Sequence, residues 1–73
     1  MYDFIGHNIT AEDIENAVDR YIVGKSAERN RQILKSRFID GLTYEKLAEK
    51  YDLSVSHVKF IVYKLENVVY DNL

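Results

Sequence analysis

The chain has 73 residues, a formal net charge of −2 and no cysteine. This length suits one small domain, and the lack of cysteine excludes disulfides and thiolate zinc sites. No apolar stretch approaches the ~20 residues of a membrane span, so we expect a soluble, cytoplasmic protein with no membrane partner. Residues 25–73 carry nine Lys or Arg against seven Asp or Glu, whereas residues 1–24 are acidic. The weakly basic body favours modest attraction to phosphate groups.

Capping signals mark four helix starts along the chain. Three of them share an apolar residue, a Ser or Thr cap and a second apolar residue at the fourth helical position: Ile9-Thr10 with Ile14, Leu42-Thr43 with Leu47, and Leu53-Ser54 with Val58. The hydroxyl accepts a free backbone N–H, and the apolar pair packs as a hydrophobic staple. Ser26 is expected to cap the remaining helix without a staple.

Helical spacing then predicts helices over about 11–23, 27–40, 44–51 and 55–70. Gly24 and Gly41 are expected to end the first two, because glycine readily adopts the left-handed conformation. The inward positions of the first three helices are Ile14, Ala17, Val18, Tyr21 and Ile22, then Ile33, Leu34 and Phe38, then Leu47, Ala48 and Tyr51. The predicted fold class is all-α, a compact four-helix domain over residues 10–73. An N-terminal arm over residues 1–9 precedes it and contains Tyr2, Phe4 and Ile5.

The third and fourth predicted helices form a helix-turn-helix over residues 43–70. Only residues 51–53 separate them, so the helices must cross steeply and apolar side chains must fill the angle between them. The residues in those positions are Leu47, Tyr51, Leu53, Val58 and Ile61. Asp52 falls where the backbone needs a positive φ, which Asp tolerates.

Three motifs follow one another within residues 28–66. They are Arg31-Gln32-Ile33-Leu34-Lys35-Ser36-Arg37-Phe38, then Asp40-Gly41-Leu42-Thr43-Tyr44-Glu45-Lys46-Leu47-Ala48, then Leu53-Ser54 with Val58 and Ile61. Together they resemble region 4, the C-terminal promoter-recognition domain of bacterial primary sigma factors. The resemblance implies a last helix that enters the major groove of the −35 promoter element, and a preceding helix that contacts phosphates.

The resemblance is weaker where bases are read. The family typically has Arg, Glu, Arg and Gln along the start of its recognition helix, so −35 specificity does not carry over to this chain. A complete sigma factor also needs a further domain, for which 73 residues leave no room. We therefore expect a small, free-standing transcription regulator or accessory factor of bacterial or phage origin, with double-stranded DNA as its partner.

The fourth helix has two contrasting faces. One is an apolar arc expected in the core: Val55, Val58, Ile61, Val62, Leu65, Val68 and Val69. The opposite face carries Ser56, Lys59, Phe60, Tyr63, Asn67 and Tyr70. For DNA, the expected base-contacting residues are Val55, Ser56, His57, Lys59 and Phe60, with phosphate contacts from Arg37, Thr43, Tyr44 and Tyr63.

An alternative for the same face is protein binding. Phe60, Tyr63 and Tyr70 would then anchor RNA polymerase, a sigma factor or a second copy of the chain, because aromatic residues are enriched at interfaces. Both functions can coexist, since many helix-turn-helix proteins bind DNA as dimers.

We expect no enzyme activity, no cofactor, no metal and no small-molecule substrate. His7 and His57 lie in different elements, and the chain has no cysteine for either to activate. The three glycines stand far apart, which excludes a glycine-rich phosphate loop. A bundle this small also has little room for a pocket of several hundred Å³.

Overall fold

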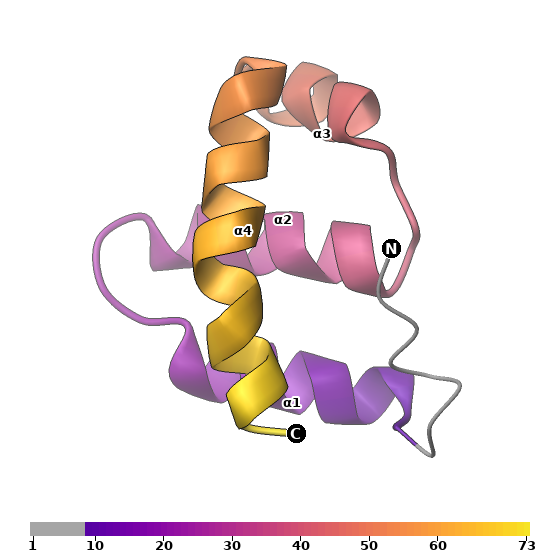
Figure 1. The fold of residues 1–73 in the computed structure, drawn as a ribbon, viewed down its shortest axis with the longest axis vertical. Coiled ribbons are helices and arrows are strands. Elements are labelled where there is room, and N and C mark those ends of the chain that lie inside the picture. Colours follow the sequence, from indigo (N-terminus) through magenta and orange to yellow (C-terminus); the bar gives the residue numbers. More distant parts are fainter. Residues whose placement is uncertain (1–8) are drawn as a thin grey trace.

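The computed structural model describes residues 9–73, which form four helices and no strand (Figure 1). The helices are α1 (Ala11–Tyr21), α2 (Ala27–Phe38), α3 (Tyr44–Tyr51) and α4 (Val55–Asp71). Figure 1 shows α4 running along the length of the molecule, from α3 near its first turn to α1 near its last, with α2 in between. The predicted all-α fold is confirmed. The predicted arm lies outside the described residues except for Ile9, which packs against the core.

Three of the four predicted caps form as expected. Thr10 Oγ1 accepts the Asp13 N–H at 3.1 Å, and Asp13 accepts the Thr10 N–H in return at 3.0 Å. Thr43 and Ser54 each accept one backbone N–H at the starts of α3 and α4. Each cap satisfies a donor that the first helical turn leaves unpaired, which stabilises a helix by about 1 kcal/mol.

The prediction that Ser26 caps α2 with its side chain is wrong. Ser26 has left-handed backbone angles, φ 62° and ψ 21°, and its hydroxyl makes no cap hydrogen bond. A side-chain cap needs an extended backbone at that position, so the left-handed backbone of Ser26 accounts for the missing cap. The start of α2 is held instead by a turn in which the Ala27 N–H donates to the Gly24 carbonyl at 3.2 Å.

The first two helices end earlier than their glycines predict. α1 stops at Tyr21 because Ile22 adopts an extended backbone and buries its side chain, so Gly24 follows the helix end instead of forming it. Gly24 does take a positive φ of 97°, within the loop to α2. α2 ends at Phe38, and the positive φ of Gly41 lets the Leu42 N–H turn back to the Ser36 carbonyl.

The core lies where α4 crosses the other helices. Its buried apolar residues are Ile14, Ala17, Val18, Ile22, Ile33, Leu34, Phe38, Leu47, Ala48, Val58, Ile61, Val62 and Val69. Burial of each large aliphatic side chain contributes roughly 1.5–3 kcal/mol. Tyr21 was predicted to belong to this set, but it is exposed, with the Arg20 guanidinium 5.7 Å from its ring centroid. In an exposed position the Tyr21 hydroxyl keeps its hydrogen bonds to water, which burial would remove.

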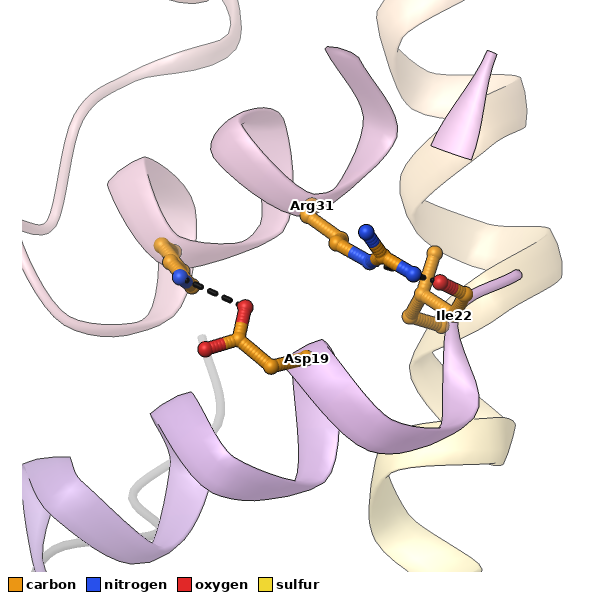
Figure 2. A network of polar contacts seen from close by, with 4 residues as sticks. Asp19, Ile22 and Arg31 are labelled. Carbon is orange, nitrogen blue, oxygen red and sulfur yellow. Dashed lines mark hydrogen bonds and ion pairs between the residues drawn. The ribbon is translucent and has the colours of Figure 1, made fainter. Parts of the chain in front are cut away.

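Two polar contacts join α1 to α2 (Figure 2). Lys35 Nζ lies 2.7 Å from the Asp19 carboxylate, and Arg31 Nε donates to the Ile22 carbonyl at 2.7 Å. The ion pair is partly exposed, so its contribution is small. The Arg31 bond matters more, because it satisfies a carbonyl that the early end of α1 leaves without a helical partner.

Candidate nucleic-acid interface

The outward face of α4 is fixed by the rotation that the core imposes on this helix. Val58, Ile61 and Val62 are buried, which turns Ser56 and Phe60 to the solvent. The exposed fraction of Phe60 is 62%, and Tyr63 and Tyr70 on the same side are also exposed. We call Ser56 and Phe60, which lie one turn apart, the outer strip. Large exposed aromatic residues gathered on one helix face are typical of a contact surface.

A cluster of two tyrosines and two cations lies on one side of the outer strip. The Arg37 guanidinium carbon is 4.3 Å from the centroid of the Tyr44 ring, and Lys59 Nζ is 5.7 Å from it. The rings of Tyr44 and Tyr63 meet edge to face at 6.1 Å. Arg37 also donates to the Leu42 carbonyl at 2.9 Å, which holds its guanidinium in place. We call these four residues the tyrosine cluster.

Burial raises the pKa of the Tyr44 phenol above its ordinary value of 10.0. The positive charge of Arg37 lowers this pKa, but the neighbouring Tyr63 raises it, so the net direction is upward. Tyr44 therefore keeps its proton at neutral pH and remains a hydrogen-bond donor. A neutral hydroxyl beside two cations suits binding of an anion such as a phosphate, which a phenolate would repel.

A recess of about 200 Å³ lies on the other side of the outer strip, between the start of α2 and α4. Its lining residues are Lys25, Ser26, Arg29, Asn30, His57, Phe60, Ile61, Lys64 and Leu65. No Asp or Glu lines it, and within residues 9–73 none of its three cations forms an ion pair. Lys64 Nζ is 5.7 Å from the Phe60 ring centroid. We call this the basic recess.

Helical geometry places these two groups on opposite flanks of α4. At about 100° per residue, Lys59 and Tyr63 fall on one side of the outer strip and His57 and Lys64 fall on the other. Each flank is completed by α2, which supplies Arg37 to the tyrosine cluster and Arg29 to the basic recess. The result is a narrow, weakly polar strip with positive charge on both sides.

The predicted site residues divide among these features. Arg37, Tyr44, Lys59 and Tyr63 come together in the tyrosine cluster, whereas the sequence predicts a base contact for Lys59. Thr43 is exposed at the start of α3, where its hydroxyl accepts the Lys46 N–H. His57 lines the basic recess, and Val55 is half-buried against the core. Tyr70 is exposed more than two turns beyond Phe60 on α4.

Sequence reasoning missed Lys25, Arg29 and Lys64 as members of a site. The spacing of four residues between Phe60 and Lys64 could have identified Lys64, because such residues are neighbours on a helix surface. No comparable signal exists for Lys25 and Arg29. They reach α4 only through the packing of α2 across it, which depends on the tertiary fold.

A larger hollow of about 420 Å³ lies between the outer face of α1 and the end of α4. Its volume is larger than we expect for so small a bundle, and it shares no residue with either flank of the outer strip. The one acidic side chain that lines it, Asp13, is engaged in the Thr10 cap. Among residues 9–73 there is no group of three His, Asp or Glu placed to hold a metal ion. None of the four helices is long and apolar enough to cross a membrane.

Comparison with known protein families matches residues 27–64 to the family described as Sigma-70, region 4. The match runs from the start of α2 through α3 to the middle of α4, so it includes the whole tyrosine cluster and the outer strip. No curated protein and no solved structure matches the chain.

Proposed function

The chain belongs to the sigma-70 region 4 family of DNA-binding helix-turn-helix domains, and from that premise we propose that it is a transcription regulator or accessory factor of bacterial or phage origin. In this proposal α4 enters the major groove of duplex DNA with the outer strip facing the bases. Val55, Ser56, His57 and Phe60 lie nearest the base edges, and Thr43 at the start of α3 contacts a phosphate.

The observation that carries the proposal is the positive charge on both sides of the outer strip. A helix in the major groove has one phosphate backbone on each side, in a groove about 12 Å wide. The tyrosine cluster is suited to the backbone on one side, with Arg37, Lys59, the neutral hydroxyl of Tyr44 and the hydroxyl of Tyr63 as donors. The basic recess is suited to the other, with Lys25, Arg29 and Lys64. Phosphate contacts of this kind position a protein on duplex DNA.

The salt dependence of duplex binding tests this arrangement. Lys59→Ala and Lys64→Ala should each weaken binding and reduce the slope of log K against log salt concentration by about 1, because each removes one phosphate contact. Fluorescence anisotropy with a labelled random-sequence duplex, titrated from ~20 mM salt upward, measures both quantities. Arg20→Ala on α1 is the matched control, since it removes the same charge at a residue outside the outer strip and both of its flanks. The proposal fails if no duplex binds at the lowest salt, or if all three variants change the slope equally.

A second candidate function is protein binding through Phe60, Tyr63 and Tyr70, which is favoured by the exposure of all three side chains. The partner would be RNA polymerase or a second copy of the chain. For the homodimer, sedimentation of the wild-type protein should show a dimer that Phe60→Ala and Tyr63→Ala convert to monomer. A wild-type protein that sediments as a monomer at all concentrations would remove this version.

A further inference from the structure

The outer strip has few groups that can read a base by hydrogen bonding. Ser56 offers a single hydroxyl, which pairs with more than one kind of base and discriminates poorly. Lys59 is directed to the Tyr44 ring in the tyrosine cluster, and Lys64 lies on the side of the basic recess. Asn67 lies on the same face of α4 but about 10 Å further along the helix than Phe60. The side chain that projects furthest from the strip is therefore an apolar ring.

An exposed phenylalanine at the centre of a DNA-reading surface restricts what that surface can recognise. In the major groove, hydrogen-bonding groups line the edges of all four base pairs, and only thymine presents a methyl group. An apolar ring gains nothing from the hydrogen-bonding groups and buries apolar area against the methyl. The Phe60 ring is available for such a contact, since 62% of the residue's surface is exposed.

We propose that Phe60 recognises the 5-methyl group of thymine, so that methyl contacts rather than paired hydrogen bonds select the DNA target of this chain. The proposal rests on the proposed function, because it requires α4 to lie in the major groove. It assigns the flanks and the strip different tasks. Arg37, Lys59 and Lys64 supply affinity that does not depend on sequence, whereas Phe60 supplies the preference for sites that contain thymine.

Deoxyuridine provides a direct test, because it lacks only the methyl group and keeps the hydrogen-bonding groups of thymine. A target is first selected from a random duplex library with the wild-type protein. Each thymine of that target is then replaced by deoxyuridine, one position at a time, and affinity is measured at fixed salt. Loss of one buried methyl should weaken wild-type binding about fourfold at one or two positions. Phe60→Ala should bind the thymine and deoxyuridine versions equally well.

Tyr70→Ala is the matched control, since it removes another exposed aromatic side chain of α4 and should leave the deoxyuridine effect intact. Wild-type affinity that is unchanged by every replacement would overturn the inference while leaving DNA binding established. A deoxyuridine effect that persists in Phe60→Ala would also overturn it, because another residue would then contact the methyl. Failure to recover any duplex from the library would instead count against the proposed function.

Discussion

Leu47→Ala is expected to reduce the free energy of unfolding by roughly 2–5 kcal/mol, the range for removing a fully buried leucine side chain. Leu47 has no exposed surface, and it belongs to the same buried cluster as Val58 and Ile61 of α4. A domain of this size has a total stability of only about 4–11 kcal/mol. The variant should therefore melt roughly 10–30 °C below the wild type, as followed by circular dichroism.

Val23→Ala is the matched control for this substitution. Val23 also has an aliphatic side chain, but it is 71% exposed in the loop between α1 and α2. Its replacement should change stability by less than about 0.5 kcal/mol. If both variants lost the same free energy of unfolding, Leu47 would not be a buried core residue as the structure has it.

Arg37→Ala is expected to weaken duplex binding roughly 10- to 150-fold, more than the lysine substitutions on α4. Arg37 donates one N–H to the Leu42 carbonyl and shares a side-chain hydrogen bond with Tyr44, and a guanidinium has five N–H donors, so others are available for a phosphate. Its stacking on Tyr44 also holds the phenol beside the guanidinium, where both would face the same phosphate in the proposed complex. The alanine variant therefore loses a charged contact and the support of its neighbour together.

Arg37→Lys separates these two contributions. Lysine keeps the positive charge but lacks the planar group that stacks on the ring and donates to the carbonyl at the same time. We expect it to keep the wild-type salt slope while losing much of the affinity, whereas Arg37→Ala should lose both. Thermal melting of each variant checks that the fold is retained. An affinity for Arg37→Ala within twofold of the wild type, in a folded protein, would exclude Arg37 from the interface.

Local signals explain why the fold could be predicted from the sequence. Caps such as Thr10 and Ser54 act within one helical turn, and the apolar arc of α4 follows directly from helical spacing, so both appear in the sequence itself. The errors arise where tertiary packing overrides local preference. Ile22 leaves the helix to bury its side chain, and the resulting loop gives Ser26 a left-handed backbone. The residues next to Ile22 and Ser26 in the sequence give no signal that predicts either backbone conformation.

The candidate site also has some features that the sequence predicts and others that depend on the tertiary fold. The sequence predicted that Phe60 and Tyr63 would be exposed, because both lie opposite the buried arc of α4. It could not predict that Lys59 turns toward Tyr44, because that ring belongs to α3 and its position depends on the crossing of the two helices. The basic recess was missed for the same reason, since Arg29 and Lys64 are far apart in the chain.

The place of α4 in the chain has a consequence for biosynthesis. This helix packs against each of the other three, yet residues 55–71 are made after them. A nascent chain that has reached only Ser54 lacks Val58, Ile61, Val62 and Val69, which belong to the same buried cluster as Ile14, Ile33 and Leu47. Domains generally fold as units once their core can close. We therefore expect the protein to fold only after α4 has left the ribosome.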